Sequence, residues 1–410
     1  MRILYLTQYF PPEIGATQDR AYEMTRHLAR AGHHVTAVTE VPNHPSGIIP
    51  RAYQGKLYTR ERVDGVDVIR LWVKTSPYKD FKSRVKFYLS YASMATLGGL
   101  ALAHGHYDVV YATSPPLFVG LAGLAVSMLR RVPFVFEVRD LWPESAVQLG
   151  YLRDPRVVRW VTKLEELFYA KAAKIVVVTE GIRQRLIERG YAPNRLALIR
   201  NGGSGRLLRA AAQPQPEAKA ALGLDGKFVV LYAGIHGVAQ GMEVLVDAAH
   251  RLRREPDVQF VFVGEGPVKR DVRAQVGQLG LDNLTLLPER PREQVRALYD
   301  AADAVLVPLR DRPLFRGAVP TKMFDAWACQ RPVVLSVRGE AQGIAEEMGG
   351  GIAVEPENAQ QIANAILRLK RDPAECATMG QRGYAAVVER FSRDALAREL
   401  ERELIAIVGK

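Results

Sequence analysis

Short apolar runs alternate with amphipathic helical patterns along almost the whole chain, and this alternation limits the fold more than any other feature of the sequence. Runs that predict strands lie in the first half at residues 3–8, 35–39, 109–113, 134–138, 175–179 and 196–200, and in the second half at 228–233, 259–263, 284–286, 304–308, 333–335 and 352–354. Helical patterns, such as residues 17–31 and 156–172, fill the spaces between them. Apolar strands separated by helices are typical of parallel sheets covered on both faces. Asp64-Gly65, ahead of a strand at 66–71, predicts a hairpin inserted in the first sheet.

The two series of strands are separated by a Gly-rich segment at residues 201–205 and a stretch of Ala, Gln and Pro at 210–216. A chain of 410 residues is long for one hydrophobic core, so two domains are expected. We predict an α/β protein with two Rossmann-like parallel-sheet domains, residues 1–205 and 206–390, that face a central cleft. Residues 391–410 form a C-terminal helix that is expected to pack back on the first domain. Ligands of such folds bind at the carboxyl ends of the strands.

Charge and cysteine content narrow the class of partner and the compartment. A formal net charge of +12 indicates an anionic partner, such as a phosphorylated ligand, a nucleic acid or a membrane surface. The basic residues are dispersed and no recognition motif occurs, so we expect no nucleic-acid partner. Two cysteines, Cys329 and Cys376, are too few for a disulfide framework and favour the cytoplasm. The apolar run within residues 1–10 is too short for a signal peptide, and no segment predicts a transmembrane helix.

The segment at residues 314–332 carries the clearest sign of a ligand. It predicts a short helix that Pro320 precedes, with Thr321 as N-cap and Lys322 in the first turn. A helix N-terminus with an adjacent ammonium attracts phosphate. Asp325, one turn deeper on the same face, can accept hydrogen bonds from the two hydroxyls of a ribose. Phosphate and ribose together indicate a nucleotide, although a capped helix with surface charges shows the same pattern.

Three loops that follow predicted strands are further candidates for ligand contact. Gly15 lets the backbone after the first strand approach a phosphate or a sugar. Gly234 opens a loop with three glycines in eight residues, which is typical of a cradle of backbone N–H groups. His236 in that loop either contacts the ligand or is simply solvated. Gly264 and Glu265 form a sharp turn after the next strand, and each of these loops also has a purely structural interpretation.

A cluster of ionisable residues, Glu137, Arg139, Asp140 and Glu144, lies at the carboxyl end of a predicted buried strand. Burial and mutual charge shift pKa values in such a cluster, which makes it a candidate catalytic site. The alternative interpretation is a set of salt bridges that holds Trp142 in place.

Residues 79–91 combine Lys and Arg with aromatic side chains at helical spacing. This pattern fits a helix that makes peripheral contact with an anionic membrane or with a lipid-linked substrate. It fits equally a solvated basic face with Phe87 and Tyr91 in the core, and both interpretations stay open. The chain has no Asp-x-Asp pair for a metal on a diphosphate, so we expect no metal and no other cofactor. Positive charge and helix dipoles would then neutralise the leaving group.

These motifs, in this order and spacing, resemble the retaining GT-B glycosyltransferases of family 4, especially the bacterial branch with O-antigen and capsule N-acetylfucosamine transferases. The matching segments are residues 11–15, 139–145, 176–180, 232–234, 239–241, 264–267 and 320–325. The resemblance implies a sugar nucleotide held mainly by the second domain and an acceptor held by the first. It also implies transfer with a retained anomeric configuration and without a metal ion.

The resemblance also assigns roles to individual residues of this chain. Lys322 would meet the diphosphate of the donor, and Asp325 would bind its ribose. Gly15 would approach the phosphates from the first domain, and Arg290 lies in the turn that would meet the base. Further donor contacts are expected from Gly234, His236, Gly264, Glu265, Pro320 and Thr321.

Several positions depart from the family pattern. Gly317 stands where a first carboxylate is expected, which leaves the sugar hydroxyls to backbone groups of Gly317, Ala318 and Val319. Ile235 and Gln240 stand where an Arg and a Lys are frequent, so diphosphate binding depends more heavily on Lys322. Arg139 takes the place of a common active-site histidine.

We therefore expect a glycosyltransferase that moves a sugar from a nucleotide-sugar, with UDP as the expected nucleotide, to a saccharide or polyprenyl-diphosphate-linked acceptor. It would act in cell-surface polysaccharide or lipopolysaccharide synthesis, in the cytoplasm or at the inner face of the cytoplasmic membrane. Lys322 would stabilise the departing diphosphate, while the four ionisable residues at 137–144 position the acceptor and the donor sugar. A sugar-nucleotide 2-epimerase or hydrolase on the same scaffold is one alternative. A non-catalytic nucleotide-sugar-binding protein is another.

Overall fold

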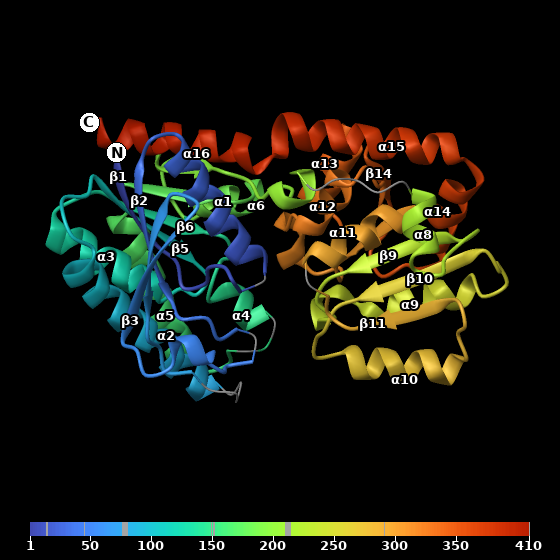
Figure 1. The fold of residues 1–410 in the computed structure, drawn as a ribbon, viewed down its shortest axis with the longest axis horizontal. Coiled ribbons are helices and arrows are strands. Elements are labelled where there is room, and N and C mark those ends of the chain that lie inside the picture. The colour runs from blue at the N-terminus through green and yellow to red at the C-terminus, as the bar shows by residue number, and fades with distance from the viewer. Residues whose placement is uncertain are drawn as a thin grey trace. The chain divides into compact units, whose positions relative to one another are not determined.

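The computed structural model describes residues 1–13, 15–44, 46–75, 81–148, 150, 152–209, 215–290 and 292–409. The chain divides into a first unit, Met1–Arg200 with Arg393–Lys410, and a second unit, Asn201–Ser392 (Figure 1). The division falls five residues before the predicted boundary. The closing helix α16, Arg393–Val408, belongs to the first unit, where it packs on α1, Ala16–Arg30.

The first unit contains a sheet of eight strands among the described residues, in the order β3-β4-β2-β1-β5-β6-β7-β8. Its strands are β1 Arg2–Leu6, β2 His34–Glu40, β3 Tyr58–Val63, β4 Val66–Leu71, β5 Val109–Ser114, β6 Phe134–Val138, β7 Lys174–Val177 and β8 Leu196–Leu198. All pairs are parallel except β3 with β4, which form the predicted hairpin around Asp64-Gly65. The other helices are α2 Phe81–Leu97, α3 Val119–Arg130, α4 Glu144–Gln148, α5 Pro155–Lys171 and α6 Glu180–Glu188, with a π-helical turn at Gly98–Leu102 and 3₁₀ turns at Arg51–Tyr53 and Pro193–Arg195.

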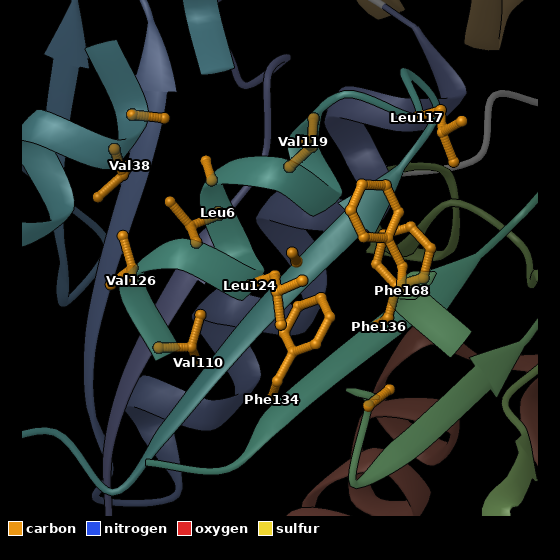
Figure 2. Packing of buried hydrophobic residues seen from close by; sticks show 14 of the residues in the cluster. Leu6, Val38, Val110, Leu117, Val119, Leu124, Val126, Phe134, Phe136 and Phe168 are labelled. Atoms are coloured by element: carbon orange, nitrogen blue, oxygen red, sulfur yellow. The ribbon is translucent and has the colours of Figure 1, made fainter. Parts of the chain in front are cut away.

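The core of the first unit explains why its strands are apolar on both faces. Leu6, Val110 and Phe136 lie on one face of the sheet, where α3 and α5 cover them (Figure 2). Tyr5, Tyr111 and Val176 lie on the opposite face, in a second buried cluster that includes residues of α1 and α16. A strand buried on both sides reads as a continuous apolar run, and this is why each one could be located from the sequence.

The second unit contains a sheet of six described strands, all parallel, in the order β11-β10-β9-β12-β13-β14. Its strands are β9 Phe228–Ala233, β10 Val258–Val263, β11 Leu284–Leu287, β12 Ala304–Pro308, β13 Val333–Ser336 and β14 Gly351–Ala353. Its helices are α7 Gly205–Arg209, α8 Gln215–Ala220, α9 Met242–Arg251, α10 Lys269–Leu279, α11 Arg292–Ala301, α12 Thr321–Ala328, α13 Glu340–Met348, α14 Ala359–Arg371 and α15 Pro373–Ala386, with shorter turns at Val238–Gln240, Pro313–Gly317 and Val387–Phe391.

Three strands, β1, β7 and β8, end two residues before their predicted ends. The early ends of β7 and β8 each have a local cause. Thr179 leaves the sheet because its side chain accepts a hydrogen bond from the N–H of Ile182 and caps α6. The carbonyl groups of Ile199 and Arg200 accept hydrogen bonds from the guanidinium of Arg20. Polar side chains thus end two strands that the apolar pattern alone would extend.

Candidate active site

Lys322 lies in the first turn of α12 in the second unit, as the sequence predicts. The prediction that Thr321 is the N-cap is wrong, because Thr321 is already helical and Pro320 occupies the cap position without a side-chain acceptor. The Nζ of Lys322 lies 4.1 Å from the ring centroid of Tyr232, at the end of β9. A Cβ atom added to Gly234 would lie 3.0 Å from the same Nζ, so this ammonium sits directly against the glycine loop.

The Lys322 ammonium is buried and has no hydrogen-bond partner among the described residues. The residue as a whole is half-buried. Burial lowers the pKa of Lys322 to about 7, and the negative charge of Asp325 opposes this effect only in part. A buried cation without a counter-ion is unfavourable, so the position favours an anionic ligand.

His236 lies in the same loop and is fully buried, so the interpretation that it is simply solvated is wrong. Its ring stands edge-on to Tyr232, with the centroids 5.6 Å apart. Neither ring nitrogen has a hydrogen-bond partner among the described residues. Burial lowers the pKa of His236 to about 4, and the positive charge of Lys269 adds to this effect. The ring is therefore neutral at physiological pH and carries one donor and one acceptor.

The two glycine loops after β9 and β10 touch through their backbones. The N–H of Gly234 donates to the carbonyl of Val263 at 3.0 Å, and the N–H of His236 donates to the carbonyl of Glu265 at 2.9 Å. Gly234 and Gly264 have φ values of +147° and +139°, which favour glycine. A Cβ atom on Gly264 would lie 1.9 Å from the carbonyl oxygen of Gly234, so only glycine fits there.

Lys269 ties these loops together, and sequence reasoning did not identify it. Its Nζ donates to Glu265 Oε1 at 2.6 Å, to the Gly264 carbonyl at 2.7 Å and to the Leu287 carbonyl at 2.9 Å. The hydrogen bond from Lys269 lowers the pKa of Glu265. Glu265 is thus ionised and engaged within its own loop. The only signal in the sequence was the spacing of four residues between Glu265 and Lys269 at the start of a helix.

The other predicted donor-binding residues of the second unit lie around α12 or at a loop. Asp325 Oδ1 accepts a hydrogen bond from the N–H of Ser204 at 3.0 Å, so this carboxylate also anchors the segment that begins the unit. Gly317 ends a 3₁₀ turn, Ala318 follows it, and Val319 is buried. Arg290 is exposed after β11. The structure leaves the ribose and base roles of Asp325 and Arg290 as predictions.

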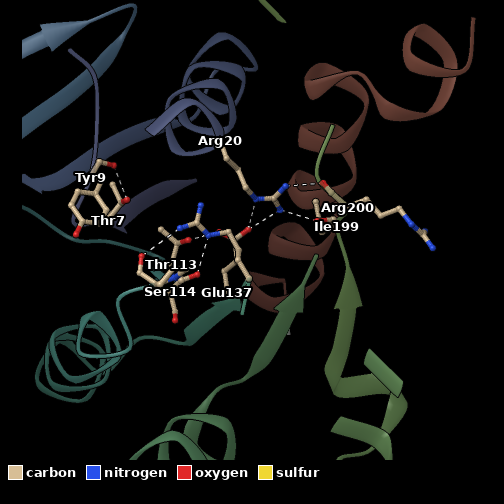
Figure 3. A network of polar contacts seen from close by, with 10 residues as sticks. Thr7, Tyr9, Arg20, Thr113, Ser114, Glu137, Ile199 and Arg200 are labelled. Carbon is tan, nitrogen blue, oxygen red and sulfur yellow. Dashed lines mark hydrogen bonds and ion pairs between the residues drawn. The ribbon is translucent and has the colours of Figure 1, made fainter. Parts of the chain in front are cut away.

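In the first unit, Glu137 is fully buried at the end of β6 and forms an ion pair with Arg20 at 2.7 Å (Figure 3). Its second oxygen accepts a hydrogen bond from the hydroxyl of Thr113. Burial opposes ionisation of Glu137, but the charges of Arg20 and Arg139 outweigh it and lower the pKa of the carboxyl group. This geometry makes Glu137 a positioning residue, because both of its oxygens bind protein groups.

The other three residues of the predicted cluster lie nearer the surface than Glu137. Arg139 donates to the carbonyl of Ser114 at 2.9 Å, and its Nε lies 3.9 Å from Glu137 Oε2. Asp140 accepts a hydrogen bond from the hydroxyl of Ser145 at 3.0 Å, and burial raises its pKa. Glu144 is half-buried and lies 3.4 Å from Arg185. Arg139, Asp140 and Glu144 thus remain the candidates for substrate contact.

Gly15 is the N-cap of α1, and no side chain caps the start of this helix. A Cβ atom on Gly15 would lie 2.3 Å from Oε1 of Gln18, which shows that this side chain folds over the glycine. Whether phosphate approaches here stays a prediction.

Two further expectations concern metals and membranes. Among the described residues, no three His, Cys, Asp or Glu side chains gather closely enough to hold a metal ion. No helix in the described part of the chain is long and apolar enough to cross a membrane. Within segment 79–91, residues 79 and 80 lie outside the described residues. Tyr91 is buried and donates to the carbonyl of Val38, and Phe87 packs against the core, as the structural interpretation of this segment predicts.

Comparison with known families gives one match for each unit. Residues 15–202 match the model of the glycosyl transferase 4-like domain, and residues 227–372 match the model of glycosyl transferases group 1. The chain is 24% identical over 377 residues to WcaI of Escherichia coli (strain K12), a glycosyl transferase assigned by name to colanic acid biosynthesis. This match covers 89% of the chain and 91% of WcaI.

Solved structures resemble the chain over its whole length. HepE of Anabaena, in complex with UDP-glucose, matches with a TM-score of 0.72 and 19% identity, over 99% of this chain and 100% of that one. WaaG, a glycosyltransferase involved in lipopolysaccharide biosynthesis, matches with a TM-score of 0.70 and 16% identity, over 100% of both chains. At these identities the likeness concerns the fold, which is the GT-B fold.

Proposed function

The chain is a glycosyltransferase with the GT-B fold, built from a glycosyl transferase 4-like domain and a group 1 domain, and we propose that it uses a UDP-sugar as donor. We propose further that it transfers the sugar to a saccharide acceptor with retained anomeric configuration and without a metal ion. The complexes of HepE with UDP and with UDP-glucose support the choice of nucleotide. The names of WcaI and WaaG support a place in cell-surface polysaccharide synthesis.

One observation carries the proposal: the buried Lys322 ammonium faces a glycine loop and has no partner among the described residues. The diphosphate of a nucleotide-sugar supplies the missing counter-charge. The N-terminus of α12 and the backbone of the glycine loop add partial positive charge at the same place. His236, which is neutral and buried beside Tyr232, can donate one ring N–H to a phosphate oxygen.

This arrangement suits the chemistry of the departing diphosphate. As the bond between the sugar C1 and the phosphate oxygen breaks, negative charge develops on that oxygen. A fixed cation stabilises this charge more in the transition state than in the bound donor, which accelerates the step. For retention, the acceptor hydroxyl attacks C1 on the face that the diphosphate leaves, and its proton passes to the leaving phosphate oxygen. No separate carboxylate base is needed on this route.

The first unit would hold the acceptor. Arg139, Asp140 and Glu144 lie at the carboxyl end of β6, where parallel sheets bind ligands. Glu137 lies 3.9 Å from the Nε of Arg139, positions that side chain and takes no direct part in the transfer. We propose a polyprenyl-diphosphate-linked saccharide as acceptor, reached at the cytoplasmic face of a membrane, in keeping with the polysaccharide and lipopolysaccharide roles in the names of WcaI and WaaG.

The test is nucleotide binding by the full chain, measured as a shift in thermal unfolding with UDP, GDP, ADP and dTDP. A ligand that binds the native state raises the unfolding temperature, and UDP should give the largest shift. Lys322→Met should abolish most of that shift. Lys370→Met, which removes a lysine that is paired with Glu255 and Asp257, should leave the shift unchanged. An unchanged UDP shift in Lys322→Met would contradict the proposal.

Transfer itself requires a second measurement. Donor consumption should depend on a lipid-linked saccharide acceptor. Consumption or isomerisation of the donor without acceptor would instead identify a hydrolase or a 2-epimerase. Nucleotide binding without turnover across a panel of acceptors would identify a binding protein.

A further inference from the structure

A cavity of about 440 Å³ opens in the first unit at the amino ends of β1, β2 and β4. Its lining includes Arg2 of β1, His34 and Thr36 of β2, Asp67 of β4, and Arg60 and Arg62 of β3. Strand register places these side chains on one face, since Arg2 pairs with His34, Thr36 with Asp67, and Asp67 with Arg62. The cavity has the size of a small-molecule site.

Aromatic side chains and backbone carbonyl groups form the wall of the cavity beside Arg2. Tyr107 is buried, and its hydroxyl donates to Thr36 Oγ1 at 2.8 Å. The guanidinium of Arg2 lies 5.7 Å from the centroid of the Tyr107 ring, and that of Arg130 lies 5.2 Å from it. Arg130 is held by the carbonyls of Gly99 and Gly105, both at 2.9 Å. The side chains beside Arg2 are therefore held by contacts with one another and with the backbone.

The charge of the lining is positive after internal pairing is counted. Glu61 forms an ion pair with Arg70, and Asp67 lies 3.3 Å from His34 and 4.0 Å from Arg62. Within the described residues, no carboxylate lies within ion-pair distance of the Arg2 or Arg60 side chains.

Both uncompensated arginines keep donors for a ligand. The Nε of Arg2 is buried and has no hydrogen-bond partner among the described residues. Arg60 is exposed and donates to the carbonyl of Leu102 through one of its five N–H groups. Two guanidinium groups with free donors therefore line one cavity.

We propose that this cavity binds a phosphate group, which belongs either to a small soluble molecule or to a lipid headgroup. The planar fork of arginine matches phosphate with two parallel hydrogen bonds. Loops that carry the proposed transfer chemistry follow the carboxyl ends of the strands, whereas Arg2 and His34 begin β1 and β2. The five residues of β1 separate the two edges by about 16 Å, so this site is distinct from the acceptor site.

The test is hydrogen–deuterium exchange of the full chain with inorganic pyrophosphate. We expect slower exchange at residues 58–71 and 102–107, separate from any protection of the second unit at residues 229–241. The location of the protection distinguishes this site from the proposed donor site, so either proposal can fail alone. Arg60→Gln should raise the pyrophosphate concentration that gives half-maximal protection of residues 58–71 at least tenfold. Arg51→Gln, which removes an exposed arginine outside the cavity, should change it less than twofold.

Two results would overturn the proposal: no protection of residues 58–71 in the wild type, or equal protection in Arg60→Gln and Arg51→Gln. Arg60 is exposed, so its loss should not impair folding, and Arg62→Gln gives a second variant with the same expected direction. Sedimentation with phosphatidylglycerol vesicles distinguishes the two sources of phosphate. Vesicle binding that Arg60→Gln weakens assigns a lipid headgroup, whereas pyrophosphate protection without vesicle binding assigns a soluble compound.

Discussion

Each unit contains a buried cluster of ionisable side chains near the end of a strand, and the two clusters differ in how their charges are paired. In the first unit, Glu137 binds Arg20 and Thr113 and lies near Arg139. In the second unit, Lys322 and His236 are buried with no partner for the ammonium or for either ring nitrogen among the described residues. The first cluster is complete without a ligand, and the second is not.

This difference separates a structural role from a binding role. A buried charge with full pairing holds elements together, as Arg20 does when it links α1 to Glu137 and to the carbonyls that follow β8. A buried charge without pairing lowers stability until a ligand arrives. This unfavourable burial favours the binding of an anion at Lys322. The pKa shifts differ in the same way, because the partners of Glu137 lower its pKa, whereas burial lowers the pKa of Lys322.

The largest expected effect is on stability in the first cluster. Glu137→Gln keeps the shape of the side chain but leaves Arg20 and Arg139 buried without a counter-charge. Loss of one partner of a buried ion pair costs about 3–5 kcal/mol, and urea unfolding should show a loss of that size. The control is Glu403→Gln, whose partner Lys174 lies in a surface pair and should cost at most about 1 kcal/mol. Equal costs in the two variants would contradict the structural role of Glu137.

The second cluster should respond in the opposite way. Lys322→Met replaces an unpaired buried ammonium by an apolar side chain of similar length, so the free energy of unfolding should stay the same or rise. The turnover number should fall about 10²–10³-fold, the size of effect that follows the loss of one group that stabilises developing negative charge. Unfolding and steady-state transfer should be measured on the same preparation. A Lys322→Met variant that is less stable yet fully active would show that Lys322 has a structural role and not a binding role.

The fold was largely predictable because the strands are buried on both faces. All twelve apolar runs predicted as strands of the two sheets correspond to strands, and the hairpin at Asp64-Gly65 is present. The errors lie where polar side chains act on the backbone, as at Thr179, or where a residue that often caps a helix is already inside it, as at Thr321. Such competition is local and depends on φ and ψ, which an apolar pattern does not specify.

The site was predictable only in part. Glycine at 234 and lysine at 322 follow from loop and helix-start patterns, and the structure brings them within contact. The partner of Glu137 is Arg20, which lies 117 residues away, so no local pattern could identify the pair. The burial of His236 depends on the contact between two loops. A loop histidine considered alone gives no sign of it.

The next effect in size concerns the contact between the glycine loops. Gly264→Ala forces a Cβ atom to within 1.9 Å of the Gly234 carbonyl and requires a positive φ, so backbone must shift. Strain of this kind costs about 1–3 kcal/mol, and the displaced loop should also weaken UDP binding. Gly277→Ala in α10 is the matched control, because a Cβ atom meets nothing within 4 Å there. That control should stabilise the protein by about 0.4–1 kcal/mol, and chemical unfolding with UDP titration would measure both variants.

The smallest predicted effect is a pH dependence that only the second cluster should show. In the free protein burial lowers the pKa of Lys322 to about 7, from 10.5 for an ordinary lysine side chain. Between pH 7 and 10.5 the unfolded chain therefore holds more protons at this group, so stability of the free protein should rise with pH. A bound diphosphate raises the pKa of Lys322, so binding above pH 7 takes up a proton. Affinity should then fall by up to about tenfold per pH unit above 7.

Calorimetric titration of UDP at pH 8, in two buffers with different ionisation enthalpies, measures this proton uptake directly. Wild type should take up a proton on binding, and Glu137→Gln, if it is folded, should do the same because its cluster does not titrate in this range. Lys322→Met should bind weakly without uptake. Proton uptake that persists in Lys322→Met would show that the titrating group belongs to the nucleotide or to another side chain. The two clusters would then differ in the pairing of their charges but not in their protonation near pH 8.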